Sequence, residues 1–429
     1  RKVGSVYRPN YAKGKQKWYP GLELNASIRA AIAECGVALV TEQVWGGSYT
    51  YSNRFHPHRK HLADVGQKTE VRTIRTSNAV PIWEKDKGKT IVGCEVLDLE
   101  YFTKVEIFGY VIAENNADKT LPPASLAKMM TTYIVSNEIA AGRMSKDETL
   151  LISDNAWEKG GAKTDGSTMF LNPRTRVSVS DLMRGVIIQS GNDACVAMAE
   201  HIAGTEDAFV DLMNSWAKQL GMNDSYFENS HGLDSDNHKT TAYDMAILGA
   251  ALIRDVPEEY RVYAEKSSTF NGITQYNRNG LLWDNSLKVD GIKTGHTSGA
   301  GYNLVSSATN DEGMRLITVV MGTSSESARK AESKKLLNYG FRFFETITPY
   351  KAGDTFVSQK IWYGDVDNVD LGVMTDTPIT ISRGKAKDLQ ANFELTKPLA
   401  APLEKGETVG RVFFQLDGKD IAQFPLVTL

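Results

Sequence analysis

The sequence has little of what marks several large classes of protein. Its 3 cysteines, Cys35, Cys94 and Cys195, are too widely spaced for a zinc knuckle or a redox pair. Its apolar runs fall well short of the ~20 residues that cross a membrane as a helix, and its basic start lacks the apolar segment of a signal peptide. A formal net charge of −3 gives no support to nucleic acid as a partner. What is present is a 429-residue chain of ordinary globular composition, long enough for several domains.

The cysteine and histidine residues predict no metal site and no cofactor. Cys195 lies in NDACVAMAEHIAG on an apolar helical face, which is typical of a small, buried hydrophobic residue. The odd number of cysteines argues against a disulfide framework. His56, His58 and His61 cluster near the N-terminus without a carboxylate or thiolate at ligand spacing. We therefore expect a solvated loop at these histidines.

Changes in sequence pattern divide the chain into three parts. Residues 1–89 match no pattern that we recognise and form a candidate N-terminal extension. Residues 90–348 alternate helical patterns such as SVSDLMRGVIIQ with strand-like runs such as MRLITVVMG, which predicts an α+β domain. Residues 349–429 alternate apolar and polar residues, and LDGKD is a hairpin signal, so we expect a small all-β domain, a sandwich.

The stretch PPASLAKMMTTYIVS predicts a helix that carries a lysine beside the core. Pro122 and Pro123 end an extended segment, and apolar residues then recur at helical spacing. Ser125 and Lys128 are three positions apart, so they share one face of the helix. Two interpretations are open. Either the lysine stem covers apolar surface with its ammonium in water, or a desolvated amine of lowered pKa takes a proton from the serine.

A second polar pair stands at a join between apolar segments. Ser190 and Asn192 follow the run GVIIQ and precede the helical pattern DACVAMAEHIAG. Polar side chains at a buried join need partners, which a catalytic cleft or a structural turn can supply. A similar triplet, Ser235-Asp236-Asn237, lies in the polar loop HGLDSDNHKT. Because of this context, we take Ser190 and Asn192 as the candidate site residues.

The third motif is Lys293-Thr294-Gly295, which occurs once, in VDGIKTGHTSGAGYNLV. This stretch predicts strand, turn and strand. On a strand edge Lys293 would bring positive charge to a bound carboxylate or oxyanion, whereas in a plain hairpin it would be solvated. A second Ser-x-x-Lys, at 327–330, lies in SSESARKAESKK, which is typical of solvated surface. In this order, the three motifs match the set found in class A β-lactamases and penicillin-binding proteins.

The chain from about residue 109 to 429 resembles the low-molecular-mass penicillin-binding proteins of the D-alanyl-D-alanine carboxypeptidase type, the group of penicillin-binding proteins 5 and 6. The resemblance rests on long, ordered stretches, among them AENNADKTLPPASLAKMMTTY, IIQSGNDACVAMAE, FNGITQYNRNGLLWDNSL and, in the tail, FVSQKIWYGD and GRVFFQLDGK. It implies a penicillin-binding/β-lactamase-like catalytic domain, with an antiparallel sheet flanked by helices, followed by the all-β domain.

The resemblance also implies catalytic roles for the matching residues. Ser125 would be the acylated nucleophile, and Lys128 would be the base that takes its proton. Ser190 would relay a proton to the leaving amine, and Asn192 would hold the substrate amide. Lys293 would polarise this network.

The same resemblance implies residues that bind the substrate. Thr294 and Thr297 would help bind the terminal carboxylate, and the backbone N–H groups of the nucleophile and of His296, next to Gly295, would form the oxyanion hole. His296 would either modulate the pH dependence or be an inert turn residue. Arg278 is a candidate for carboxylate recognition, with an exposed loop arginine as the alternative.

The implied function is a serine D-Ala-D-Ala carboxypeptidase that removes the terminal D-alanine from peptidoglycan stem peptides and is acylated by β-lactams. One alternative is a β-lactamase; class A enzymes use a glutamate for deacylation, but Glu200, Glu206 and Glu228 lack the expected context. The other alternative is a non-catalytic scaffold that binds the cell wall.

Two departures from the family concern the ends of the chain. Relatives have only a few tens of residues before their Ser-x-x-Lys motif, whereas more than a hundred residues precede Ser125 here, and the strand expected at this place is not recognised. Either TIVGCEVLDLEYFTKVEIFGYVIA supplies that strand, or the N-terminal segment is an extension with its own role or a misread frame. Relatives also continue into an amphipathic helix that lies on the membrane, so we expect a trimmed or incomplete chain. By resemblance, the protein is placed in the periplasm, at the outer face of the cytoplasmic membrane.

Overall fold

The computed structural model describes residues 110–162, 166–396 and 398–429, and before them the backbone of five strands. The first four of these strands form two antiparallel pairs, β1 with β2 and β3 with β4. Their bounds are Val40–Gln43, Glu70–Thr73, Ala79–Trp83 and Ile91–Val96. The remainder of the predicted extension 1–89, including Cys35 and the histidine cluster, lies outside the described residues, and the predicted domain boundaries stay predictions.

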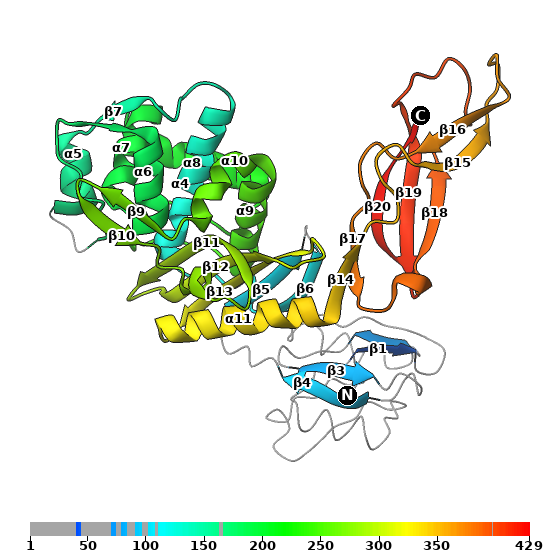
Figure 1. The fold of residues 1–429 in the computed structure, drawn as a ribbon, viewed down its shortest axis with the longest axis horizontal. Helices are drawn as coiled ribbons and strands as arrows, with labels where there is room; N and C mark the ends of the chain where they lie inside the picture. Colours follow the sequence, from blue (N-terminus) through cyan, green and yellow to red (C-terminus); the bar gives the residue numbers. More distant parts are fainter. Residues whose placement is uncertain are drawn as a thin grey trace. The chain divides into compact units, whose positions relative to one another are not determined.

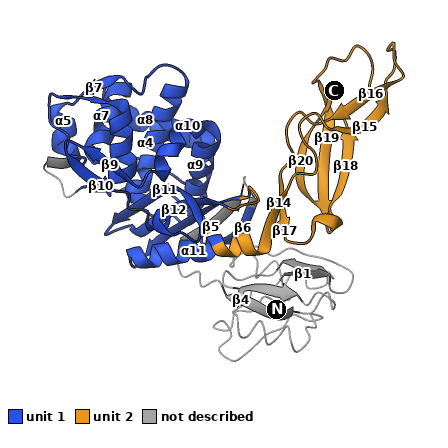
Figure 2. Cartoon of the chain, viewed as in Figure 1, with its two compact units in different colours: residues 1–309, 315–337 blue, residues 310–314, 338–429 orange. Residues whose placement is uncertain are grey.

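Two compact units make up the structure (Figure 2). The larger unit comprises residues 1–309 and 315–337, and the smaller unit comprises residues 310–314 and 338–429. Each unit has a hydrophobic core of its own.

A five-stranded antiparallel sheet is the centre of the larger unit (Figure 1). Its order is β11-β12-β13-β5-β6, with bounds Lys288–Thr297, Gly301–Thr309, Arg315–Thr323, Phe102–Ile107 and Tyr110–Asn115. Strand β5 pairs with β13 on one side and with β6 on the other. The segment TIVGCEVLDLEYFTKVEIFGYVIA therefore contains β5 and the start of β6, which agrees with the interpretation that it contributes a strand. The opposite end of the sheet is β11, which carries the Lys-Thr-Gly motif.

Helices cover the sheet and position the motifs. The longest on one side of the sheet are α4, α7, α8 and α9, with bounds Lys128–Ala140, Asn192–Ala203, Glu206–Leu220 and Ala242–Asp255. Helix α4 is buried from Lys128 to Ser136, so it is the central helix of this layer. Helix α9 packs on the sheet, where Gly249 lets it approach Ile292 and Ile317 closely. The 3-10 turn η1, Ala124–Ala127, leads directly into α4.

Shorter elements complete the larger unit. The helical ones are α5 (Asp154–Trp157), η2 (Glu158–Ala162), α6 (Val179–Arg184), η3 (Gly185–Gln189), α10 (Pro257–Tyr260), η4 (Arg261–Ala264) and η5 (Gly280–Trp283). The strand pairs are β7 (Thr149–Leu151) with β8 (Arg176–Ser178) and β9 (Ser267–Phe270) with β10 (Ile273–Tyr276). Helix α11, Glu326–Phe343, begins in the larger unit.

Apart from the end of α11 and the 3-10 turn η6 (Ala386–Asp388), the smaller unit is all-β, as the sequence predicts for residues 349–429. A five-stranded sheet of order β15-β16-β20-β19-β18 accompanies the pair β14-β17. The bounds of β14 to β20 are Phe344–Ile347, Thr355–Lys360, Asn368–Gly372, Ile379–Ser382, Gln390–Leu395, Thr408–Leu416 and Lys419–Thr428. The LDGKD hairpin is confirmed, because Leu416 pairs with Lys419 across a two-residue turn. Both turn residues, Asp417 and Gly418, have positive φ, as a type I′ turn requires.

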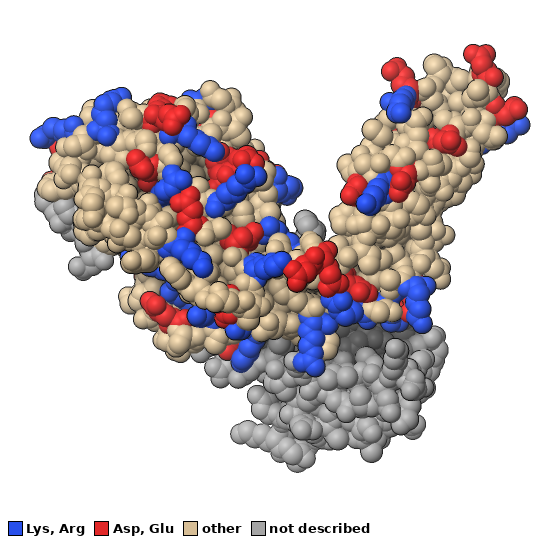
Figure 3. Space-filling model, viewed as in Figure 1, with Lys and Arg blue, Asp and Glu red and all other residues tan. Residues whose placement is uncertain are grey.

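Neither sign of charge is concentrated on the described surface that Figure 3 shows. On the face drawn in Figure 3, basic and acidic side chains are interspersed over both units. Among the described residues, no helix is both long enough and apolar enough to cross a membrane.

Candidate active site

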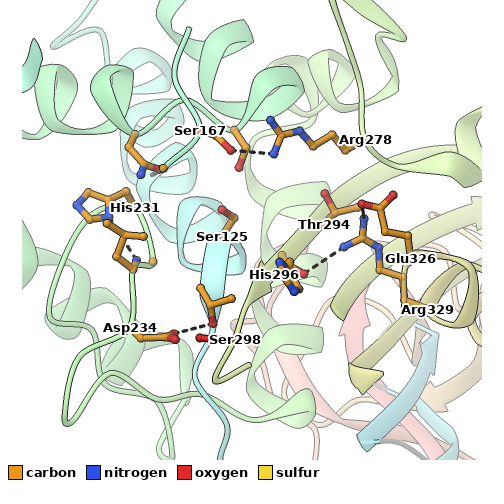
Figure 4. Close-up of a pocket in the computed structure, with 17 residues that line it drawn as sticks. Ser125, Ser167, His231, Asp234, Arg278, Thr294, His296, Ser298, Glu326 and Arg329 are labelled. Carbon is orange, nitrogen blue, oxygen red and sulfur yellow. Dashed lines mark hydrogen bonds and ion pairs between the residues drawn. The ribbon is translucent and has the colours of Figure 1, made fainter. Parts of the chain in front are cut away.

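A cleft of about 750 Å³ in the larger unit brings all three motifs together (Figure 4). Ser125 from η1 lies between the 229–237 loop and strand β11. The described residues that line the cleft are Ser125, Gly166, Ser167, Ser190, Asn192, His231, Gly232, Leu233, Asp234, Arg278, Thr294, Gly295, His296, Thr297, Ser298, Glu326 and Arg329.

Lys128 is buried at the bottom of this site, with 1% of its surface exposed. Its Nζ lies 3.1 Å from Ser125 Oγ, 2.7 Å from Asn192 Oδ1 and 2.5 Å from the backbone oxygen of His231. A neutral amine has two hydrogens and one lone pair. The amide and backbone oxygens can only accept, so they take the two hydrogens. The lone pair is then left for the Ser125 hydroxyl, which is the arrangement of a general base and its nucleophile.

The surroundings of Lys128 favour this neutral form. The pKa of its amine is lowered from 10.5 to about 8, chiefly by burial with a contribution from the positive charge of Arg278, while Cys195 and Asp193 act in the opposite direction. Of the two interpretations of the motif, the structure supports the desolvated amine. Cys195 itself is buried, as predicted.

Ser190 and Lys293 form the second half of the site. Ser190, with a φ of 69°, is the C-cap residue of the π-helical turn η3, and Asn192 begins α7 after the intervening Gly191. Lys293 Nζ donates to Ser190 Oγ at 3.0 Å and to the backbone oxygen of Thr294 at 3.2 Å. Burial, and then the charge of Lys128, hold the pKa of Lys293 well below its usual value. The solvated-hairpin interpretation of Lys293 is therefore wrong.

The alternative triplet at 235–237 has a different environment. Ser235 Oγ and Asn237 Nδ2 both donate to the Glu228 carboxylate, on the exposed side of the loop. Ser327 is exposed, and neither it nor Lys330 lines the cleft. The triplet at 235–237 and the second Ser-x-x-Lys motif at 327–330 therefore do not contact Ser125 or Lys128 through the hydrogen bonds described above.

Strand β11 forms one wall of the cleft against η1. A Cβ on Gly295 would lie 3.2 Å from the backbone nitrogens of Ser125 and Leu126, so a glycine allows the strand to approach the nucleophile. His296 follows and stacks on Tyr302, with ring centroids 3.9 Å apart. The predicted oxyanion hole from the N–H groups of Ser125 and His296 stays a prediction that this close approach favours.

Thr297 lies on the cleft wall, but its hydroxyl is already engaged. It donates to Asp234 Oδ1 at 2.7 Å and accepts from the backbone nitrogen of Ala300 at 3.0 Å. Asp234 also accepts from the backbone nitrogen of Gly299 at 3.3 Å, so it links the 229–237 loop to the turn after β11. A substrate carboxylate would have to compete with Asp234 for the Thr297 hydrogen.

Two arginines supply positive charge to the cleft. Arg278 is an exposed loop residue that also lines the cleft: it donates to Ser167 Oγ at 2.8 Å, and partial desolvation lowers its pKa. Arg329, which the sequence analysis missed, is 4% exposed and donates to the backbone oxygen of Gly295 at 3.2 Å. The interpretation of SSESARKAESKK as solvated surface is wrong at this position.

The glutamates that we considered as the deacylating base of a β-lactamase accept hydrogen bonds from other residues. Glu200 accepts from Ser153 and Asn155, and Glu206 accepts from Ser230. Of the described residues that line the cleft, the one glutamate is Glu326, which has an exposed side chain. No described glutamate therefore takes the position of a deacylating base beside Ser125.

Comparison with known proteins gives a consistent result. A family model described as D-alanyl-D-alanine carboxypeptidase matches residues 106–325, and one described as penicillin-binding protein 5, C-terminal domain, matches residues 344–429. The chain is 53% identical over 345 residues to the D-alanyl-D-alanine carboxypeptidase DacA of Escherichia coli K12, which covers 80% of this chain and 85% of that protein.

Solved structures agree. The crystal structure of penicillin binding protein 5 from Haemophilus influenzae is 48% identical, with a TM-score of 0.72, and covers 77% of this chain and 96% of that one. Penicillin-binding protein D2 from Listeria monocytogenes in the cefotaxime-bound form is 29% identical with a TM-score of 0.51, and covers 56% of this chain and 96% of that one.

Proposed function

Since the chain belongs to the D-alanyl-D-alanine carboxypeptidase family, we propose that it removes the terminal D-alanine from peptidoglycan stem peptides through an acyl-enzyme on Ser125. It is a serine-type hydrolase and a penicillin-binding protein. The observation that carries the assignment of the site is the buried Lys128 amine 3.1 Å from the Ser125 hydroxyl. An unactivated serine is a poor nucleophile, and this amine provides the base that it needs.

Acylation proceeds in two proton transfers. Ser125 Oγ forms a bond to the carbonyl carbon between the two D-alanines, while its proton passes to Lys128 Nζ. The carbon–nitrogen bond to the terminal D-alanine then breaks. The leaving nitrogen takes the proton that Lys128 received, relayed through Ser190 Oγ, which Lys293 holds at 3.0 Å, so Lys128 returns to its neutral form. Free D-alanine departs, and an ester remains on Ser125.

Deacylation reverses these roles. Water gives a proton to Lys128 and adds to the ester carbon, the bond to Ser125 Oγ breaks, and the serine takes the proton back. Asn192 holds Lys128 and is placed to contact the substrate amide. A β-lactam acylates the same serine, which agrees with the cefotaxime-bound relative.

The terminal carboxylate is bound on the wall that carries positive charge. Thr294 and Thr297 of β11 line the cleft together with Arg278 and Arg329. A desolvated guanidinium is stabilised by a carboxylate, because the charge-assisted hydrogen bonds replace lost hydration. We assign carboxylate binding to this wall.

The protein acts in cell-wall metabolism in the periplasm, at the outer face of the cytoplasmic membrane. Support for this location comes from its similarity to D-alanyl-D-alanine carboxypeptidases that work on the cell wall. Membrane association would come from a C-terminal amphipathic helix of the kind found in the family.

Two measurements on the full chain test the function. A fluorescent penicillin should label a single peptide that contains Ser125, and diacetyl-Lys-D-Ala-D-Ala should release D-alanine. Ser125→Ala should abolish both while the protein stays folded. Label on another serine would overturn the site assignment, and an unlabelled wild-type protein that releases no D-alanine would favour a scaffold.

A further inference from the structure

The backbone oxygen of His231 is one of the two acceptors that orient the Lys128 amine. It belongs to the segment 229–232, which forms neither helix nor strand. Regular backbone pairing therefore does not hold this oxygen in place. Since the direction of the Lys128 lone pair depends on it, the residues that hold this segment control the base.

Hydrogen bonds from two helices, α4 and α8, hold the segment 229–232. From α4, Thr131 Oγ1 donates to the backbone oxygen of Ser230 at 2.6 Å, one turn beyond Lys128. From α8, the Glu206 carboxylate accepts from Ser230 on its backbone nitrogen at 3.1 Å and on its hydroxyl at 2.6 Å. Both Ser230 donors thus converge on one oxygen, Oε1. Ser230, the residue before His231, is therefore held by hydrogen bonds from both helices.

The position of Glu206 is fixed by its burial and by its place at the start of a helix. It is 8% exposed and is the first residue of α8, where a carboxylate is favoured by the helix dipole and Thr205 caps the turn. Burial lowers the pKa of His231 to about 3, so its ring is neutral. The backbone nitrogen of Leu233 approaches His231 Nδ1 at 3.4 Å, which leaves the hydrogen on Nε2, 3.6 Å from Glu206 Oε1.

We propose that Glu206 is a positioning residue for the general base. It holds Ser230, Ser230 fixes the His231 oxygen, and that oxygen takes one Lys128 hydrogen so that the lone pair faces Ser125. Without the carboxylate, two buried donors of Ser230 lose their acceptor and the segment must move to satisfy them. A misdirected lone pair slows proton transfer, because reactivity falls steeply with small errors of geometry. The inference rests on the proposed role of Lys128 as the base.

The test uses the full chain and the second-order rate of acylation by a fluorescent penicillin, measured from pH 6 to 10. Glu206→Ala should slow acylation at every pH by roughly tenfold or more. Glu206→Gln keeps an oxygen that can accept from Ser230, so it should restore the rate to within about threefold of wild type. The matched control is Glu200→Ala, which also removes a carboxylate with two donors, Ser153 and Asn155, but on α7 away from Lys128. It should acylate as wild type does.

Each outcome decides the inference. A wild-type acylation rate in Glu206→Ala overturns it, as does an equal loss of rate in Glu200→Ala at a matched loss of melting temperature. If Glu206→Ala does not fold, Ser230→Ala tests the proposal instead, because it removes only the hydrogen bond from the Ser230 hydroxyl to Glu206. An acylation rate of Ser230→Ala equal to that of wild type would reject the proposal. The proposed function is tested separately, because its failure would appear as absence of label on Ser125 in the wild-type protein.

Discussion

Buried polar groups are distributed very differently in the two compact units. Among the described residues, the larger unit buries the charged side chains Lys128, Asp193, Glu206, Asp244, Glu259, Lys293 and Arg329. The buried polar residues of the smaller unit are threonines, Thr377, Thr380 and Thr428. Burying a charge costs free energy unless partners compensate it. The larger unit bears part of that cost at its active site, where Lys128, Lys293 and Arg329 lie, while no described charged residue of the smaller unit is buried.

The largest expected effect comes from removing the buried base. Lys128→Met keeps a side chain of similar length but has no basic nitrogen to take the Ser125 proton. Acylation by penicillin should fall by roughly 10²- to 10⁴-fold, the usual contribution of a general base. The matched control is Lys360→Met in the smaller unit, where the exposed amine lies 4.8 Å from the Trp362 ring centroid. An equal loss of acylation rate in Lys128→Met and Lys360→Met would contradict the view that the buried charge of the larger unit, and not a surface charge of the smaller unit, serves the reaction.

The opposite experiment removes apolar volume from the smaller unit. Phe414 is fully buried in its core, so Phe414→Ala should lower the free energy of unfolding of that unit by about 3–5 kcal/mol. Acylation at Ser125 should be unchanged below the unfolding temperature. Tyr363→Ala is the control, because this ring is 91% exposed and its loss should leave the melting curve in place. Calorimetry and penicillin labelling of the same samples check both expectations.

A glycine beside the nucleophile should give the next effect. Gly232 has a φ of +94°, and a Cβ there would lie 1.8 Å from the backbone oxygen of Ala124, in the turn that carries Ser125. Gly232→Ala should slow acylation by roughly tenfold to a hundredfold by displacing that turn. Gly221 also has a positive φ, +82°, but open space around it. Gly221→Ala should cost only about 1 kcal/mol of stability and leave the acylation rate intact.

The smallest effect concerns the pH dependence. The neutral amine is the active form of Lys128, so the acylation rate should rise with pH through its pKa of about 8 and then level off. The charge of Arg278 helps to lower this pKa, so Arg278→Gln should raise it and shift the rise to higher pH. Arg411→Gln, in the smaller unit, should leave the profile unchanged. A shift to lower pH in Arg278→Gln would contradict the assigned electrostatics.

The catalytic motifs could be predicted from the sequence because residues close together in the chain are also close together in the site. Ser125 and Lys128 are neighbours on one turn, and Ser190 and Asn192 stand at a helix start, so their context was visible in the chain. Residues that act across the fold were missed. Glu206 follows Thr205 at the start of α8, where an acidic residue is expected for helix capping alone, and this hides its contact with Ser230.

Arg329 was missed for a different reason. The many charges of its helix outweighed a weak apolar pattern in the interpretation. Yet Arg329, Ser333, Leu336 and Leu337 follow one helical face, and all four are buried. A search for that periodicity would have found the face, although not that the guanidinium reaches the cleft.

The place of β5 limits how far the chain can be shortened from its N-terminus. Because this strand lies between β13 and β6, a version that starts at residue 110 would strip β6 of its neighbour and leave β13 with an open edge. Exposed edges of this kind invite pairing between molecules. A version intended for expression should therefore begin before Phe102, even if everything upstream proves dispensable.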